Sequence, residues 1–392
     1  MTHIEISYSP ENVRSEVIVG HDDLYSVQGQ LLRTLSSFKH LFVFIDRNLM
    51  MRSRVIYDLS LELQDMGCPM RTVDASESLK TMDNVLGMCS WLMDKGADRD
   101  AVLVAIGGGI TTDMVGFAAS IYKRGVRYIS VPTTLLSQID AAIGGKTGVN
   151  FEHYKNMLGV ISQPIFTFIW PEFLKTLPRR DFLSGAAELL KTFIIEDESE
   201  EWYGRSVILL EDYCADSEIL ERSSKELSDI IEAAAKVKAG VVSRDPHEKG
   251  ERRKLNLGHT FAHAIETLSR QDMAANGMPV LDVRNNRKSV TDITHGEAVA
   301  IGIVMAARLA EKIAAASVEL NVEKGLAERI ERDFLACGLP VESPFRIEDM
   351  IDAMSKDKKA EDGKVHFILP LAIGEVVDYE MTLSQACALL KK

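Results

Sequence analysis

The sequence predicts a two-part α/β protein: a parallel, Rossmann-like sheet flanked by helices, followed by a mostly α-helical second half. Three observations support this fold class. Apolar runs of strand length alternate with helical stretches over residues 1–170, a glycine-rich turn ends one of these runs, and strand-like runs become scarce after residue 181. Such alternation is typical of βαβ units. Prolines at 171 and 178 bracket the expected boundary, which gives domains at 1–177 and 178–392.

The clearest predicted strand covers residues 101–106, a continuous apolar run that is typical of a strand buried on both faces of a parallel sheet. An earlier strand is expected over residues 41–45. Helices are expected over residues 79–95, 229–242 and 295–315, and residues 271–292 are expected to form a loop because they lack periodicity.

Polar residues follow the predicted strands, where ligands of parallel sheets bind. Asp46 and Asn48 follow the run at 41–45, and Glu77 and Lys80 follow a further run that ends at Asp74. Taken singly, each is better explained as a helix cap or a solvated loop charge. Together they make this edge of the sheet a candidate ligand site.

The turn Gly107-Gly108-Gly109 joins the strand at 101–106 to a helical stretch that contains Asp113. Glycines let the backbone approach a ligand closely, and free N–H groups at a helix start can bind phosphate. Asp113 can favour the helix dipole or hold a nicotinamide ribose or amide. A tight turn without a ligand remains the alternative, because the G-x-G-x-x-G spacing is missing.

Composition excludes several classes of function. The 392 residues are 46% hydrophobic and 26% charged, with no signal-peptide pattern and no apolar run of membrane-spanning length. We therefore expect a cytoplasmic protein without a membrane partner. The five scattered cysteines indicate neither a disulfide framework nor a thiolate metal site. A net charge of −13 disfavours nucleic acid as a partner but leaves an anionic small-molecule substrate open.

Histidines supply the first set of candidate chemical residues. His259 and His263 stand at i and i+4, a spacing that lets both imidazoles reach one metal, and His295 opens an apolar helix. Zinc without thiolates usually needs a carboxylate, and Glu188 lies within an otherwise apolar helical stretch. The pattern predicts a metal site but leaves open whether His263 or His295 is the third ligand. Helix caps or packed core histidines are the alternative.

Basic residues supply the second set: Arg124, Lys146, Lys155, Lys191, Lys238, Arg252 and Lys358. Lys146 follows two glycines, Lys155 precedes Asn156, and Lys191 lies one helical turn after Glu188. Converging cations suit a substrate that carries a carboxylate and a phosphate. For any single lysine, a solvated surface position is the more common explanation.

These segments together resemble 3-dehydroquinate synthase, a sugar phosphate cyclase, over residues 46–359. The motifs stand in order: GGG-x3-D-x2-GF, VPTTLL-x3-DA-x2-GGKT, KN-x2-G, TLP-x-R, AE-x2-K, LN-x-GHT-x2-HAIE and HGE-x-VAIG. The resemblance implies an N-terminal dinucleotide-binding α/β domain, a C-terminal helical domain that binds metal and substrate, an active site in the cleft between them, and a homodimer.

The resemblance also implies roles for individual residues. The metal ligands would be Glu188, His259 and His295, with His263 contacting substrate. The NAD site would include Asp46, Asn48, Glu77, Lys80, Gly108, Gly109, Asp113, Thr133, Thr134, Lys146, Lys155, Phe173 and Thr176. Substrate would meet Arg124, Asp140, Lys146, Lys155, Asn156, Lys191, Lys238, Arg252, Asn256, His263 and Lys358.

The implied reaction converts 3-deoxy-D-arabino-heptulosonate 7-phosphate (DAHP) to 3-dehydroquinate and phosphate in the shikimate pathway. It uses catalytic NAD, regenerated in each turnover, and a divalent metal, zinc with cobalt as a second option. The leading alternative is a sister cyclase acting on amino-DAHP, sedoheptulose 7-phosphate or glucose 6-phosphate. More distant alternatives are a metal-dependent glycerol or alcohol dehydrogenase and a catalytically silent NAD-binding paralogue. The segment between His263 and His295 is longer than the family leads us to expect, and we expect an inserted surface loop there.

Overall fold

The computed structural model describes residues 1–8, 13–21, 24–152, 154–276, 293–317, 320–357 and 364–391. Lys358 and most of the predicted loop, residues 277–292, lie outside this range. Chain contacts divide the protein into two compact units. Unit 1 comprises Met1–Phe182 and Glu218–Glu248, and unit 2 comprises Leu183–Ser217 and Lys249–Lys392. Among the described helices, none is long and apolar enough to cross a membrane.

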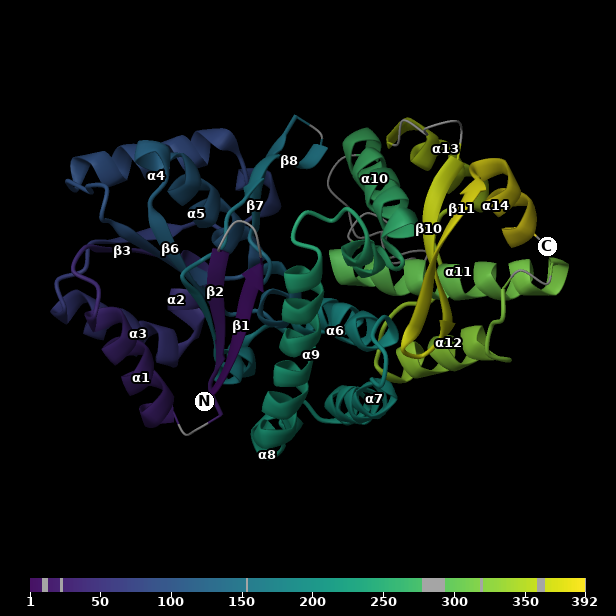
Figure 1. Ribbon diagram of the computed structural model, residues 1–392, viewed down its shortest axis with the longest axis horizontal. Helices are drawn as coiled ribbons and strands as arrows, with labels where there is room; N and C mark the ends of the chain where they lie inside the picture. Colours follow the sequence, from purple (N-terminus) through teal and green to yellow (C-terminus); the bar gives the residue numbers. More distant parts are fainter. Residues whose placement is uncertain are drawn as a thin grey trace. The chain divides into compact units, whose positions relative to one another are not determined.

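Unit 1 contains a seven-stranded sheet with helices on both faces (Figure 1) and a separate two-stranded sheet of β7 and β8. Its elements are β1 (Thr2–Tyr8), β2 (Val13–Val19), α1 (Leu24–Ser36), β3 (Leu41–Asp46), α2 (Arg47–Arg52), α3 (Arg54–Asp65), β4 (Met70–Val73), η1 (Glu77–Leu79), α4 (Met82–Asp94), β5 (Val102–Gly107), α5 (Gly109–Ile121), η2 (Tyr122–Arg124), β6 (Arg127–Pro132), η3 (Ser137–Ala141), β7 (Lys146–Phe151), β8 (Tyr154–Ile161), β9 (Phe166–Ile169), η4 (Pro171–Thr176), α8 (Ile219–Arg222) and α9 (Ser224–Arg244).

The strand order is β1-β2-β9-β6-β5-β3-β4, with every neighbouring pair parallel except β1 and β2. Alternate side chains of β3 enter two different cores. Leu41, Val43 and Ile45 pack with α1 and α3, whereas Phe42 and Phe44 pack with α4 and α5. Every residue of β5 is buried, which confirms the strand predicted over 101–106. The chain leaves β3 and β5 in opposite directions along the sheet, so their carboxyl ends form a switch point where ligands bind in such folds.

Unit 2 is mostly helical. It contains α6 (Arg179–Ile194, whose first turn belongs to unit 1), α7 (Glu200–Ala215), η5 (Glu251–Asn256), α10 (His259–Asn276), α11 (His295–Ala316), α12 (Leu326–Ala336), α13 (Ile347–Asp357), β10 (Lys364–Ala372), β11 (Glu375–Thr382) and α14 (Leu383–Leu390). Most side chains of α6 and α11 are buried, so these helices form the centre of the unit. The β10–β11 hairpin is an addition that the sequence pattern did not reveal.

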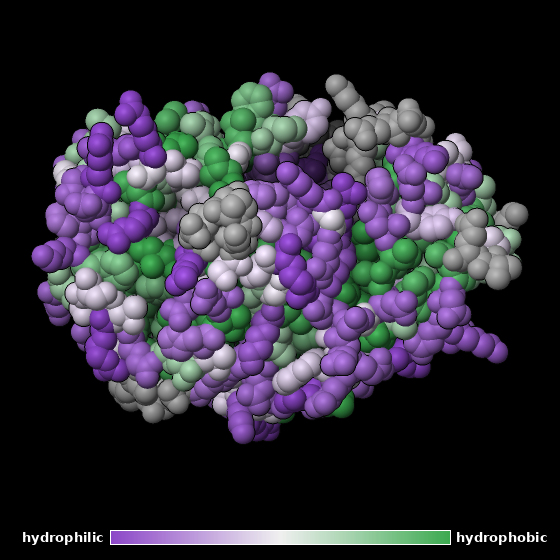
Figure 2. Space-filling model, in the orientation of Figure 1, coloured by the Kyte–Doolittle hydropathy of each residue, from purple (hydrophilic) through white to green (hydrophobic). Residues whose placement is uncertain are grey.

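The single boundary expected at 177/178 differs from these units. Its position lies close to the first crossing at Phe182 and Leu183, but residues 218–248 return to unit 1. The reason is the packing of α9, which contacts β1, β2, η3 and η4. Glu232 on α9 accepts a hydrogen bond from Thr2 Oγ1 (2.8 Å) and pairs with His21 (2.5 Å). The face of the molecule in Figure 2 is mainly hydrophilic, with hydrophobic side chains in smaller groups.

Candidate active site

In unit 2, Glu188, His259 and His295 come together from three helices. One ligand atom from each lies within 4.8 Å of the others. The Glu188 Oε1 atom is 3.2 Å from His295 Nε2 and 3.5 Å from His259 Nε2. A tetrahedral zinc ion with bonds of about 2.0–2.1 Å holds its ligand atoms about 3.3 Å apart. The separations and the His₂Glu donor set therefore fit a zinc ion that keeps an open coordination position.

Close backbone contacts bring these three helices together. A Cβ atom on Gly296, the residue after His295, would lie 1.9 Å from the Ser184 carbonyl oxygen on α6. A Cβ atom on Gly302 of α11 would lie 2.2 Å from the Gly258 carbonyl oxygen, directly before His259. Only glycine permits such approaches. The start of α11 is also fixed by a capping box between Thr294 and Glu297.

Charged neighbours set the electrostatics of this cluster. Lys191 Nζ forms an ion pair with Glu188 Oε2, and both side chains are buried on α6. Burial and the Lys191 charge lower the pKa of His259 to about 3, so its ring is neutral and able to coordinate. Burial also opposes charge on His295, but hydrogen bonds to Glu188 and Glu266 outweigh it and raise the pKa of His295 to about 10. A bound cation would take the place of that proton.

Other predicted residues of unit 2 lie on the same or adjoining elements. His263 is exposed on α10, with its ring centroid 5.6 Å from that of His259, whereas His295 lies 5.4 Å from His259. Arg252 is buried in η5, and Asn256 ends that element. Of the two histidines left open by the sequence, His295 joins Glu188 and His259 in the ligand-atom cluster, so the geometry favours His295.

In unit 1, residues predicted for cofactor binding lie at the carboxyl ends of β3 and β5. Asp46 ends β3 and accepts a hydrogen bond from the Asn48 backbone N–H (2.9 Å), and burial raises its pKa. Gly108 and Gly109 begin α5, directly after β5. Thr133 and Thr134 follow β6, the next strand of the sheet, and Phe173 and Thr176 lie on η4. The backbone N–H groups at the start of α5 therefore lie at the switch point of the sheet.

A buried lysine, Lys80, links two other predicted residues in this unit. Lys80 Nζ lies 2.5 Å from Asp113 Oδ2 and 2.5 Å from Asn156 Oδ1, and only 4% of Lys80 is exposed. Burial raises the pKa of Asp113 to about 6, although the Lys80 charge opposes this.

Asn150 joins Glu77 to the same network. Its amide donates to Glu77 Oε1 (2.8 Å), and its side-chain oxygen accepts from the Asn156 backbone N–H (2.9 Å). Sequence reasoning missed Asn150, since a single amide two residues past a Gly carries no distinguishing pattern.

Two further ion pairs connect the predicted cations of unit 1 to carboxylates. Lys238 on α9 pairs with Asp140 on η3, and Lys146 at the start of β7 pairs with Glu248. Lys155 lies on β8 beside Asn156. Arg124 is different: it is exposed at the end of η2, before the amino end of β6, whereas Asp113 lies near the start of α5, the helix that precedes η2. Among the described residues, no hydrogen bond or ion pair joins Arg124 to Lys155 or Asn156.

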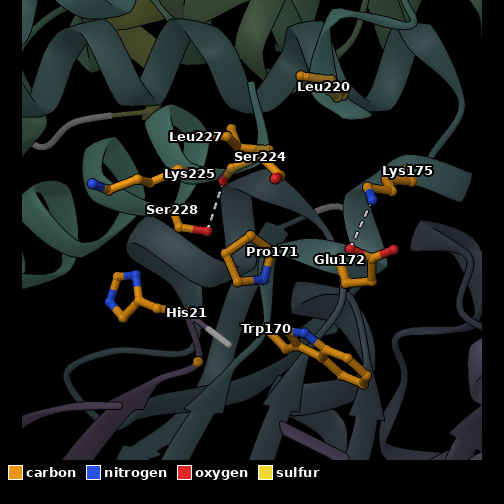
Figure 3. Close-up of a pocket in the computed structure, with 11 residues that line it drawn as sticks. His21, Trp170, Pro171, Glu172, Lys175, Leu220, Ser224, Lys225, Leu227 and Ser228 are labelled. Atoms are coloured by element: carbon orange, nitrogen blue, oxygen red, sulfur yellow. Dashed lines mark hydrogen bonds and ion pairs between the residues drawn. The ribbon is translucent and has the colours of Figure 1, made fainter. Parts of the chain in front are cut away.

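A separate pocket of about 370 Å³ lies in unit 1 (Figure 3). Within it, Lys175 pairs with Glu172 (2.9 Å), and Ser228 Oγ donates to the Ser224 carbonyl oxygen (2.9 Å). The lining residues are Gly20, His21, Trp170, Pro171, Glu172, Lys175, Leu220, Ser224, Lys225, Leu227 and Ser228. None belongs to the predicted cofactor, substrate or metal sets, so this pocket is not the predicted site.

Comparison with known proteins identifies the family. The chain matches the model of the 3-dehydroquinate synthase N-terminal region over residues 70–184 and that of its C-terminal region over residues 185–281 and 284–360. It is 37% identical to 3-dehydroquinate synthase from Microcystis aeruginosa, over 81% of this chain and 78% of that protein. It is 41% identical to the enzyme of the same name from Acidithiobacillus ferrooxidans, over 77% of this chain and 74% of that protein.

Among solved structures, the chain is similar to 2-epi-5-epi-valiolone synthase from Streptomyces hygroscopicus subsp. jinggangensis, a structure with NAD⁺ and Zn²⁺ bound. The identity is 28%, the TM-score is 0.76, and the match covers 100% of this chain and 98% of the other. The fold, the motifs and the relatives agree: this chain belongs to the 3-dehydroquinate synthase family.

Proposed function

We propose that this protein is a 3-dehydroquinate synthase that converts DAHP to 3-dehydroquinate and phosphate, with catalytic NAD and a divalent metal. The observation that carries the proposal is the convergence of Glu188, His259 and His295 in a chain whose relatives carry that name. When bound, NAD would accept and return one hydride, and zinc or cobalt would acidify the hydroxyl being oxidised.

The residues of the chain would bind and orient a substrate that is an anion at both ends. Lys155, Asn156 and His263 suit the phosphate, and Lys146, Lys238, Arg252 and Asn256 suit the carboxylate and the ring hydroxyls. Lys191, buried against Glu188, would stabilise negative charge as an enolate develops. Arg124 belongs to the same proposed set by resemblance alone, as does Lys358.

The NAD site would lie at the switch point of the unit 1 sheet. The amides that begin at Gly108 and Gly109 would face the pyrophosphate. Asp46 and Asn48 follow β3, and Asp113 is held by Lys80, positions that suit ribose hydroxyls and the nicotinamide. Glu77, Thr133, Thr134, Phe173 and Thr176 would complete this site.

A homodimer in the cytoplasm completes the proposal. The β7–β8 hairpin exposes Phe151, Tyr154, Met157 and Ile161, each at least 40% accessible. A row of exposed apolar side chains on a two-stranded sheet is typical of a protein interface. All five cysteines are free thiols, as in a reducing compartment. Sedimentation equilibrium should give twice the chain mass of 43.5 kDa.

Phosphate release from DAHP tests the function directly. Purified protein with substoichiometric NAD⁺ and zinc should release phosphate and form dehydroquinate, identified by mass, in equal amounts and without accumulating NADH. Glu188→Gln should remove this activity. Inactivity with DAHP but phosphate release from sedoheptulose 7-phosphate or glucose 6-phosphate would assign the protein to a sister cyclase activity, and net NADH formation would favour a dehydrogenase.

A further inference from the structure

A second carboxylate, Glu266, contacts the proposed metal cluster without belonging to it. Glu266 lies on α10 and is 6% exposed, and its Oε1 atom is 3.2 Å from His295 Nδ1. It follows His259 by seven residues, two turns of the same helix. One helix therefore carries one metal ligand and the group that touches another ligand.

The contact selects one tautomer of His295. An ionised carboxylate can only accept a hydrogen bond, so Nδ1 must carry the proton that it donates to Glu266. Nε2 lies 3.2 Å from Glu188 Oε1, and once a cation has replaced the proton on Nε2, the lone pair of this atom is directed into the ligand cluster. His259 has the same arrangement, with Nδ1 3.2 Å from the Leu257 carbonyl oxygen. Of these two hydrogen-bond acceptors, the Leu257 oxygen belongs to the backbone, whereas Glu266 acts through a side chain that can be replaced.

We propose that Glu266 is a positioning residue that fixes the tautomer and ring orientation of His295 and thereby strengthens binding of the divalent metal. The inference rests on the proposed function, because it requires that Glu188, His259 and His295 hold the ion. Outer carboxylates of this kind orient metal-bound histidines and increase their basicity. Burying a carboxylate is costly without such a partner, so packing alone does not account for a charge at this position.

Metal affinity measures the role independently of turnover. The full-length protein, stripped of metal, is titrated with Zn²⁺ in competition with a chromophoric chelator and with Co²⁺ while its visible absorption is recorded. We expect Glu266→Ala to weaken the binding of both ions about 10–100-fold and to change the shape of the Co²⁺ spectrum. Glu266→Gln keeps a hydrogen-bond acceptor and should recover part of the affinity.

Two other variants complete the design. Glu311→Gln makes the same change on α11, at a side chain that accepts from the Ala327 backbone N–H (3.0 Å), and should bind both ions as the wild type does. Glu188→Ala removes a ligand and should abolish binding. If the wild type binds no ion, or Glu188→Ala binds normally, the proposed metal site is wrong. If that site stands but both Glu266 variants match the wild type in affinity and spectrum, the inference about Glu266 is overturned. If Glu266→Ala does not fold, Glu266→Gln alone tests the inference, because loss of the charge should still weaken the binding of both ions.

Discussion

Replacing Gly296 by alanine tests how the proposed metal ligands are brought together. The new Cβ atom would lie 1.9 Å from the Ser184 carbonyl oxygen, about 1.5 Å short of an ordinary contact of 3.4 Å. The obstacle is backbone, so α11 and α6 must separate. Metal sites tolerate shifts of only about 0.2 Å, and His295 and Glu188 stand on the two separating helices. We expect zinc affinity to fall more than about 100-fold, and overpacking to cost about 1–3 kcal/mol of unfolding free energy.

The assay combines zinc titration against a chelator with urea unfolding of the metal-free protein. Gly204→Ala is the matched control, because Gly204 lies within α7 of the same unit and a Cβ atom there has nothing within 4 Å. That change should raise stability by about 0.5–1 kcal/mol and leave zinc binding unaltered. Wild-type zinc affinity in Gly296→Ala would refute the argument that this close approach sets the ligand geometry.

Three further results are expected. His259→Ala and Lys155→Ala should each abolish turnover with little change in circular dichroism, and near-normal activity of either purified variant would contradict the site assignment. Chelation should remove activity reversibly, with zinc restoring it. Because the pKa of Asp113 is raised to about 6, its folded carboxyl keeps a proton that the unfolded chain releases at lower pH. This contribution to stability is present near pH 4 and lost as the pH rises through 6. Urea unfolding should show the wild type losing up to about 3 kcal/mol relative to Asp113→Asn between about pH 4 and 7, whereas a constant difference would exclude the shift.

Much of unit 1 could be predicted from local patterns. The strands expected over 41–45 and 101–106 are β3 and β5, and the helices expected over 79–95 and 229–242 correspond to α4 and α9; in unit 2, the helix expected over 295–315 corresponds to α11. Apolar runs and their periodicity identify such elements because the hydrophobicity of each residue can be read directly from the sequence. The return of α9 to unit 1 could not be predicted this way, since the contacts of Glu232 with Thr2 and His21 join distant parts of the sequence.

The candidate site was likewise predicted only in part from local sequence patterns. Spacing on one helix indicated His259 with His263, but the third residue of the cluster, His295, comes from another helix, and the residue pattern alone could not choose it. The choice depends on how closely the helices approach, which is set by Gly296 and Gly302. Asn150 and Glu266 were missed for a related reason. Each acts through a hydrogen bond to a residue far away in sequence. Glu266 ends the HAIE motif, but the motif alone does not show which side chain Glu266 contacts.

The order of the two units along the chain has a consequence for synthesis on the ribosome. Unit 1 is discontinuous: residues 183–217, which belong to unit 2, are made before α9 is available. Domains usually fold as their sequence emerges, but here the sheet must wait for the helix that packs on β1, β2, η3 and η4. Until residue 248 has been made, the apolar surface that α9 covers stays open to water. A nascent chain arrested near residue 217 should therefore bind chaperones more strongly than one arrested beyond residue 280.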